Sequence, residues 1–237
     1  MWIRSSSGAY LISMRILHCT DLHARDAWYR WLAAECGQFD LVCITGDLLD
    51  LNPYRSTDGQ LDRVMAHLQK ISAPIAVCSG NHDSVAGEDM RLQHSRWLQD
   101  LRRPNLWVDG DCFVLGGFRF ACMPWQGVLP REAKEDVWLI HSPPDLCPTG
   151  IARGGAGFGD PVFGELCRAG LGPPLALSGH VHEPQSWRSK TGRTWSLNPL
   201  GSDGNDSEAP AHIAVDLLAG AAVLNRASGS KDAVQLW

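Results

Sequence analysis

Residues 41–50 read LVCITGDLLD, an apolar run that ends in a Gly-Asp motif. A short apolar run of this kind, without polar alternation, is typical of a strand buried on both faces of a parallel sheet. Two other runs have the same form, and each also leads into a polar motif. We therefore expect buried strands at residues 16–19, 40–45 and 75–79.

The segments between these runs have a different periodicity. Residues 26–36 and 58–71 carry apolar side chains at helical spacing, and a third helix is expected at 88–102. Strand, helix, strand, helix, strand predicts parallel β/α units. In such sheets ligands bind in the crevice beyond the carboxyl ends of the strands. The polar motifs at the strand ends should therefore meet at one edge.

The second half of the chain favours hairpins, because its short apolar runs are separated by turns such as Gly116-Gly117. These runs predict a second sheet packed on the first. The expected fold is α/β, a four-layer αββα sandwich of two mixed β-sheets flanked by helices, with the site at the strand-end edge. The expected strands are 112–115, 118–122, 136–140, 175–178, 185–188, 193–197, 212–217 and 221–225, with loops at 142–161 and 201–210.

Length and composition set limits on the class of protein. The 237 residues fit one domain, which we place at residues 14–237 after an N-terminal extension, residues 1–13, expected to be disordered. No apolar run is long enough to span a membrane. The net charge of -5 gives no global attraction for nucleic acid. Eight cysteines without a Cys-x-x-Cys pair behave as free thiols, so we expect a cytoplasmic protein.

Polar motifs follow five of the predicted strands. Imidazole, carboxylate and amide oxygen together suit Mn²⁺, Fe or Zn²⁺, and a pair of such ions can hold a hydroxide against phosphorus. One short motif alone is often a chance match, but a full ordered series leaves chance little room. The series is Asp21-Leu22-His23, Gly46-Asp47-Leu48-Leu49-Asp50, Gly80-Asn81-His82-Asp83, His141 and Gly179-His180-Val181-His182.

In this order the motifs resemble those of the calcineurin-like metallophosphoesterases, and the likeness covers about residues 14–202. Among these proteins they are similar to the bacterial manganese-dependent phosphodiesterases and DNA endonucleases. The resemblance implies two divalent metal ions, Mn²⁺ first and Fe or Zn²⁺ as alternatives, with a bridging hydroxide that attacks phosphorus. It implies that Asp47 bridges the pair, that Asp21, His23 and His182 bind one ion, and that Asn81, His141 and His180 bind the other.

The resemblance also implies catalytic roles for two residues that are not ligands. His82 is expected to face the substrate and to protonate or stabilise the leaving oxygen. Asp50 matches the position that orients this histidine in the phosphoprotein phosphatase branch, and Asp83 is the rival partner.

Departures from the phosphoprotein phosphatases indicate another substrate. Leu51-Asn52 stands where that branch has Arg-Gly, and Asp83 stands where it has Glu. We therefore predict a phosphodiesterase acting on nucleic acid, in the manner of a DNA endonuclease with single-stranded DNA as a candidate, or on nucleotides. The alternatives are a small-molecule cyclic-nucleotide diesterase, a phosphomonoesterase and, from another class, a noncatalytic scaffold.

Substrate choice is expected to depend on loops around the metals. Arg25 is a candidate to bind a phosphate oxygen, with a solvated arginine as the alternative. Trp28, Trp31 and Trp125 either stack a nucleobase or belong to the core. Residues 151–160 contain a glycine-rich stretch that is interpreted as a mobile lid.

Overall fold

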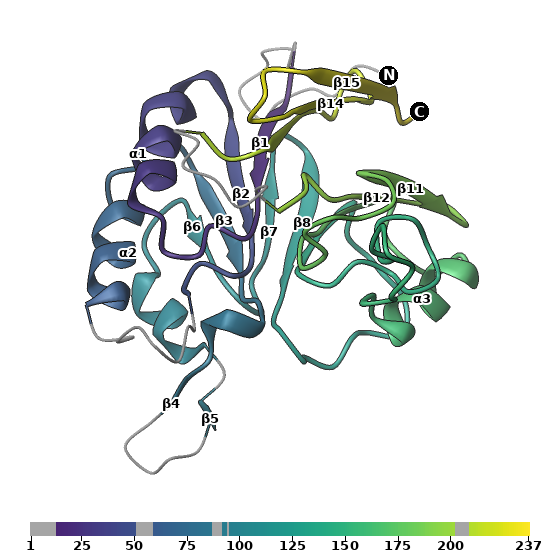
Figure 1. Ribbon diagram of the computed structural model, residues 1–237, viewed down its shortest axis with the longest axis horizontal. Helices are drawn as coiled ribbons and strands as arrows, with labels where there is room; N and C mark the ends of the chain where they lie inside the picture. The colour runs from purple at the N-terminus through teal and green to yellow at the C-terminus, as the bar shows by residue number, and fades with distance from the viewer. Residues whose placement is uncertain (1–12, 51–58, 87–91, 94, 202–208) are drawn as a thin grey trace.

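The computed structural model describes residues 13–50, 59–86, 92–93, 95–201 and 209–237 (Figure 1). The predicted extension at residues 1–13 therefore lies, apart from Ser13, outside the described residues. Within the described segments, no helix combines the length and the apolar character needed to cross a membrane. A single domain over residues 14–237 stays a prediction.

The first sheet contains the three strands predicted from the apolar runs. Every residue of β2 (Leu41–Thr45) and β3 (Ile75–Cys78) is buried, as expected for strands covered on both faces. The centre of the sheet is parallel, and an antiparallel extension pairs with β1 (Arg15–Cys19). In order, the strands are β15 (Lys231–Gln235), β14 (Ala221–Asn225), β13 (His212–Asp216), β1 (Arg15–Cys19), β2 (Leu41–Thr45), β3 (Ile75–Cys78) and β6 (Leu106–Trp107).

Two helices cover one face of this sheet. They are α1 (Asp26–Glu35), which is followed by the short 3-10 helix η1 (Cys36–Gln38), and α2 (Gln60–Leu68). Side chains alternate along the strands, so that Leu17 packs with the helices while Ile16 faces the opposite way. The amphipathic spacing read from the sequence is therefore confirmed for both helices.

The second sheet has six strands and carries one helix, α3 (Pro161–Arg168), on its outer face. Phe163 of α3 stacks on Trp138, with ring centroids 5.7 Å apart. The strand order is β11 (Arg188–Thr191), β12 (Thr194–Leu197), β10 (Leu175–Leu177), β9 (Val137–Ile140), β8 (Phe118–Met123) and β7 (Cys112–Leu115). Strands β8, β9, β10 and β12 run parallel to one another, whereas β7 and β11 pair antiparallel with β8 and β12.

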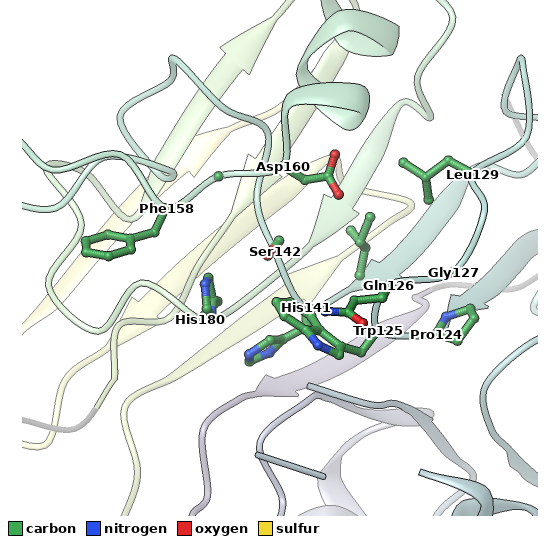
Figure 2. Close-up of a pocket in the computed structure, with 12 residues that line it drawn as sticks. Pro124, Trp125, Gln126, Gly127, Leu129, His141, Ser142, Phe158, Asp160 and His180 are labelled. Atoms are coloured by element: carbon green, nitrogen blue, oxygen red, sulfur yellow. The ribbon is translucent and has the colours of Figure 1, made fainter. Parts of the chain in front are cut away.

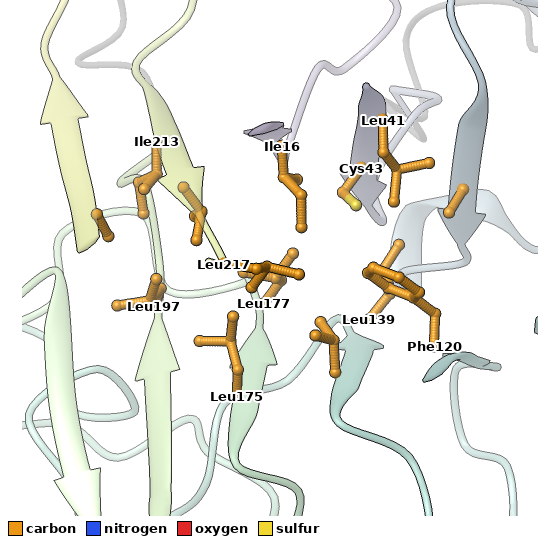
Figure 3. Close-up of a cluster of buried hydrophobic side chains, with 14 of the residues drawn as sticks. Ile16, Leu41, Cys43, Phe120, Leu139, Leu175, Leu177, Leu197, Ile213 and Leu217 are labelled. Atoms are coloured by element: carbon orange, nitrogen blue, oxygen red, sulfur yellow. The ribbon is translucent and has the colours of Figure 1, made fainter. Parts of the chain in front are cut away.

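The inner faces of the two sheets share one apolar core (Figure 3). Ile16 and Cys43 from the first sheet meet Leu139, Leu177 and other residues of the second. With α1 and α2 on one side and α3 on the other, the four layers of the predicted αββα sandwich are present (Figure 1). The fold class predicted from the sequence is confirmed.

The helix predicted at residues 88–102 is wrong. Residues 92–93 form β5 (Leu92–Gln93), which pairs with β4 (Val85–Ala86), and only a 3-10 helix, η3 (Arg96–Leu101), follows. Residues 87–91 and 94 lie outside the described residues. Trp97 donates its indole N–H to the backbone oxygen of Asp83 at 2.9 Å, which ties the segment to the third motif. Pro104 also disfavours helical backbone just before it.

Other boundaries were missed for local reasons. The strand expected at 185–188 begins only at Arg188, because the backbone N–H groups of Gln185 and Ser186 donate to a neighbouring loop instead. Helix α3 and strand β15 were not predicted. The start of α3 had a readable signal, since Asp160 caps it by accepting from the N–H of Phe163 and Pro161 occupies the first turn.

Candidate metal centre

The predicted ligands lie at the carboxyl ends of five strands, three in one sheet and two in the other. Their loops leave β1, β2 and β3 of the first sheet, and β9 and β10 of the second. Parallel strands bring the side chains that follow them to a shared edge. All seven predicted ligands gather at this edge: Asp21, His23, Asp47, Asn81, His141, His180 and His182.

One group of donors surrounds Asp21, which is buried. Its Oδ1 lies 3.2 Å from Nε2 of His182 and 3.9 Å from Nε2 of His23, and the two Nε2 atoms are 3.3 Å apart. Asp47 belongs to the same group, in which one ligand atom from each residue lies within 4.8 Å of the others. Two imidazole nitrogens directed at one carboxylate oxygen and at each other form a natural cation site.

A second group of donors surrounds Asn81. Its Oδ1 lies 3.1 Å from Nε2 of His141 and 2.8 Å from Nδ1 of His180. The Nε2 of His141 is also 3.3 Å from Oδ1 of Asp47. Asp47 therefore touches both groups, which is the position required of a bridging ligand.

The surroundings of His141 fix its tautomer. Its Nδ1 lies 2.7 Å from the backbone oxygen of Thr45, which can only accept, so Nδ1 carries a proton. The Nε2 atom is then directed at Asn81 and Asp47. Metal-binding histidines commonly donate their other N–H to a carbonyl in this way. The donor set thus fits a pair of divalent cations.

Backbone strain concentrates in the same loops. Asp21, His23, Asp47 and His180 have φ values of 52°, 44°, 52° and 67°. Left-handed backbone is unfavourable for these residues and commonly marks functional sites. The fold therefore holds four of the predicted ligands in conformations that an unconstrained chain would avoid.

The glycines of the motifs leave room for the ligands. A Cβ atom at Gly80 would strike Asp47 and His141, and one at Gly179 would strike Asp21. A Cβ at Gly201 would meet the imidazole of His182. The glycines are therefore required for close approach of the backbone to the ligands.

Burial and neighbouring charges shift the pKa values of the predicted ligands in different directions. Burial lowers the pKa of His180 to about 4 and also lowers the pKa of His23, so both are neutral at pH 7. Burial alone would raise the pKa of Asp21, but the hydrogen bond from His182 and the charge of His141 hold it well below its usual range. Burial opposes protonation of His141, yet Asp47 raises the pKa of His141 to about 9. A cation would replace that proton.

His82 lies beside this centre. Its ring contacts the ring of His23 edge to face at 4.9 Å, and its backbone N–H donates to Asp47 at 2.8 Å. His23, Asp50 and His82 each place one ligand atom within 4.8 Å of those of the other two. The Nδ1 of His82 is buried and has no hydrogen-bond partner among the described residues.

The two candidate partners of His82 occupy different places. Asp50 lies in the group with His82, whereas Asp83 is fully buried beneath the loops. Both oxygens of Asp83 accept backbone N–H groups, from Leu49 at 2.9 Å and from Gly80 at 2.8 Å. Burial and the charge of Asp47 raise the pKa of Asp83 to about 8. Asp83 therefore ties two motif loops together, and the geometry favours Asp50 as the partner of His82.

The substrate-binding candidates fall outside the ligand groups. The guanidinium of Arg25 lies over the ring of Trp28, 4.4 Å from its centroid. Trp28, on α1, is buried in the apolar core and therefore belongs to the core rather than to a base-stacking surface. Trp31 is half-buried against His212, with ring centroids 4.6 Å apart.

A pocket of about 240 Å³ opens beside His141 and His180 (Figure 2). Trp125, Phe158 and Asp160 line it together with the two histidines. Sequence reasoning singled out Trp125 and the loop at 151–160 by position, but it missed Phe158 and Asp160 as individual residues. Both lie far along the chain from Trp125, so no local signal in the sequence linked them to this pocket.

The loop interpreted as a lid is held by hydrogen bonds. Within it, the N–H of Ala152 donates to the backbone oxygen of Ala156, and the N–H of Phe158 donates to that of Gly150, just before the loop, both at 2.8 Å. Outside it, the N–H of Arg153 donates to Glu183 at 2.8 Å, next to the last metal motif. The loop thus forms a wall beside the centre, and its movement stays a prediction.

Asn198 supports the loop of the last motif. Asn198 is buried, and its side-chain amide donates to the backbone oxygens of Gly179 and Val181 at 2.9 and 3.0 Å. Its Oδ1 accepts from the N–H of Leu200 at 2.9 Å. These bonds hold the loop that carries His180 and His182.

Comparisons with known proteins agree with this geometry. The family model described as calcineurin-like phosphoesterase matches residues 14–184. The fold is similar to that of TT1561 from Thermus thermophilus, with TM-score 0.55, 14% identity and coverage of 95% of this chain and 100% of that one. It is also similar to a purple acid phosphatase, PPD1, from yellow lupin, with TM-score 0.57, 15% identity and coverage of 99% and 58%.

A third solved structure is YfcE, a phosphoesterase from E. coli, with TM-score 0.50, 16% identity and coverage of 94% of this chain and 100% of that chain. At these identities the likeness concerns the fold. A comparison with curated proteins found no match.

Proposed function

Because the chain belongs to the calcineurin-like phosphoesterase family and is thus a hydrolase of phosphoric esters, we propose that it is a binuclear phosphodiesterase. The observation that carries the proposal is the convergence of seven donors into two groups that share Asp47. Nothing in the ligand set has been lost, which argues against a noncatalytic scaffold.

The residues divide between two cations as the resemblance implied. Asp21, His23 and His182 would hold one, Asn81, His141 and His180 would hold the other, and Asp47 would touch both. Carboxylate, amide and imidazole donors without a thiolate favour Mn²⁺, with Fe or Zn²⁺ as alternatives. When bound, such a pair supplies positive charge for the phosphoryl oxygens and activates water at neutral pH.

The residues around the cations supply position and proton transfer. His82 has a half-buried imidazole beside the centre, and its Nδ1 has no partner in the part of the chain that the structure describes; we assign to His82 proton donation to the leaving oxygen. Asp50, which lies in the group with His82 and His23, would orient that ring. We leave Arg25 as a candidate for contact with a phosphate oxygen. No side chain is needed as a nucleophile.

We propose phosphodiesters of nucleic acid or nucleotides as substrates, with single-stranded DNA as the first candidate polymer. Cyclic-nucleotide diesters and phosphomonoesters are the near alternatives. All eight cysteines lie in the described residues and are free, and seven are buried. Free thiols are typical of a reducing compartment, so a cytoplasmic location is part of the proposal.

A metal-loaded substrate panel tests the proposal. Protein treated with chelator and reloaded with Mn²⁺, Fe²⁺ or Zn²⁺ is assayed with bis-p-nitrophenyl phosphate, single-stranded DNA, cyclic nucleotides and p-nitrophenyl phosphate. We expect diester hydrolysis to exceed monoester hydrolysis and to require about two equivalents of metal. Absence of turnover with every metal, or a preference for the monoester, would contradict the proposal.

A further inference from the structure

The pocket beside the candidate metal centre has a polar group at each of two ends, and both apolar and polar residues line the space between them (Figure 2). The imidazoles of His141 and His180 form the first end, and Asp160 lies at the other. Leu129 and Ile140 contribute apolar parts of the walls, and Gln126 and Ser142 also line the pocket. A ligand that places phosphate at the metals would therefore extend a neighbouring group into the pocket.

Two aromatic side chains flank the metal end. The ring of Trp125 lies 5.4 Å from the ring of His180, and the ring of Phe158 lies 6.4 Å from it, centroid to centroid. In Figure 2 His180 lies between these two rings. Phe158 lines the pocket and is 52% exposed, so part of its side chain is available to a ligand. Aromatic side chains in such positions stack planar groups.

The Trp125 wall is anchored to the third strand. The backbone N–H of Trp125 donates to the hydroxyl of Ser79 at 2.9 Å, and the backbone N–H of Ser79 donates to Asp109 at 2.8 Å. Ser79 directly precedes Gly80 and Asn81 of the metal motif. The aromatic wall and the ligand loop thus share one support, which keeps the pocket in register with the metals.

The Phe158 wall is equally fixed. The N–H of Phe158 donates to Gly150, and Asp160 exchanges two backbone hydrogen bonds with residues 143 and 145, at 2.8 and 3.1 Å. A Cβ atom at Gly159 would strike Pro144 and Asp145, so the backbone packs closely there. Both walls are therefore formed in the free protein, as is usual for small-molecule sites.

Asp160 gives the far end a hydrogen-bond acceptor. Its Oδ1 accepts from the N–H of Phe163 at 2.9 Å, as the cap of α3. Its Oδ2 has no hydrogen-bond partner among the described residues. An ionised carboxylate accepts only, so it selects a ligand that presents an N–H or O–H donor.

We propose that this pocket binds the nucleobase of a nucleotidyl phosphodiester, with the base against Trp125 and Phe158 and one of its N–H groups toward Asp160. The inference rests on the proposed function and specifies its substrate. A base combines a flat apolar face with donors on its edge, which matches the two walls and the acid end. A simple alkyl or aryl ester matches only the walls.

The test compares two esters that share one leaving group. With Mn²⁺-loaded protein, we expect kcat/KM for the p-nitrophenyl ester of adenosine 5′-monophosphate to exceed that for methyl p-nitrophenyl phosphate by at least about tenfold. Trp125→Ala and Phe158→Ala should each reduce this ratio by about fivefold to tenfold, mostly through KM. Trp125→Phe should restore part of it, which separates loss of stacking from misfolding.

Two further variants complete the design. Val128→Ala lies in the same loop as Trp125 but is fully exposed and lines no part of the pocket, so it should leave both esters unchanged. Asp160→Asn keeps a good helix cap, and we expect it to reduce the ratio by about threefold. Comparison of a dinucleotide with a single-stranded oligonucleotide then shows whether the base belongs to a free diester or to a chain end.

The outcomes are distinguishable. Equal kcat/KM for the two esters, or equal losses on both in Trp125→Ala and Phe158→Ala, would overturn the nucleobase assignment while leaving the phosphodiesterase intact. Absence of turnover of both esters with every metal would overturn the proposed function and the inference with it. Stronger inhibition by adenosine 5′-monophosphate than by ribose 5-phosphate would support the base contact independently.

Discussion

The two sheets contribute different chemistry to one centre. The seven-stranded sheet supplies every oxygen donor of the predicted set, from Asp21, Asp47 and Asn81, together with one imidazole. The six-stranded sheet supplies only imidazoles. The side chain of Asp21 is 1% exposed and that of His182 is 49% exposed. The first sheet thus forms a buried anionic frame, and the second, which also contributes the buried His141, forms the more open side at His182.

This difference between the two sheets separates metal binding from substrate selection. Buried carboxylates are costly unless they are compensated, so the frame demands cations and fixes their positions. The open side carries the pocket lined by Trp125 and Phe158, where substrates can differ. We therefore expect changes in the frame to affect every substrate and changes on the open side to depend on the substrate.

The largest effect is expected from a change at Asp47, which touches both donor groups. Asp47→Asn keeps the shape but removes the charge that bridges the site, and we expect activity on all esters to fall by about 10³-fold or more. Metal analysis should show fewer than two ions per chain.

The matched control is Asp136→Asn, which removes a surface carboxylate paired with Arg119 at 2.9 Å. It should retain wild-type metal content and rate. Two bound ions and near wild-type turnover in Asp47→Asn would contradict the frame.

His82 tests whether a residue from the first sheet can act on the leaving group rather than on the metals. His82→Ala should lower kcat by about 10²-fold for esters with alkoxide leaving groups, and much less for p-nitrophenyl esters, which need little protonation. Metal content should remain unchanged.

A histidine far from the centre provides the reference for this variant. His212→Ala, on β13 against Trp31, should affect neither class of ester. A His82→Ala loss that is equal for good and poor leaving groups would argue for a positioning or structural role.

Variants of Asp50 and Asp83 distinguish orientation of the His82 ring from support of the motif loops. Asp50→Asn should lower kcat for poor leaving groups by about fivefold to tenfold without changing the melting temperature. Asp83→Asn places an amide N–H₂ group against a backbone N–H, because both oxygens of Asp83 accept, and should destabilise the protein by about 1–3 kcal/mol. Thermal unfolding and a series of leaving groups are measured on both variants. A loss of stability in Asp50→Asn together with a leaving-group effect in Asp83→Asn would reverse the two roles.

The smallest effect concerns stability at low pH. Burial lowers the pKa of His18 to about 3, from 6.5 when exposed, and its Nε2 lies 2.9 Å from the hydroxyl of Thr45. Between pH 6.5 and 3 the unfolded chain binds a proton there that the folded chain does not. Stability should therefore fall as pH falls through this window, by up to about 1.4 kcal/mol per pH unit from this residue.

Urea unfolding of chelator-treated protein at pH 7, 6 and 5 measures the slope, which includes the other histidines. His18→Gln keeps a hydrogen-bonding group and does not titrate, so its slope should be smaller than that of the wild type. Equal slopes would show that His18 is not the group responsible.

Much of the architecture could be predicted because it is recorded locally. The runs ending at Cys19, Thr45 and Cys78 are mostly apolar and lack polar alternation, as buried parallel strands require. Local composition misled the prediction of a helix at 88–102. The described part of that segment is held by the hydrogen bond of Trp97 to Asp83 and by the pairing of β4 with β5, and no local periodicity reveals these contacts.

The sequence by itself determined the donor types, their order and their places at strand ends, because each motif is short and directly follows its own strand. Only the tertiary structure showed that Asp50 groups with His82 and His23 while Asp83 is buried, and that Trp125 and Phe158 flank one histidine. Those relations depend on how two sheets and their loops pack across large separations in the chain. Such packing is a collective result of burial, and no single segment encodes it.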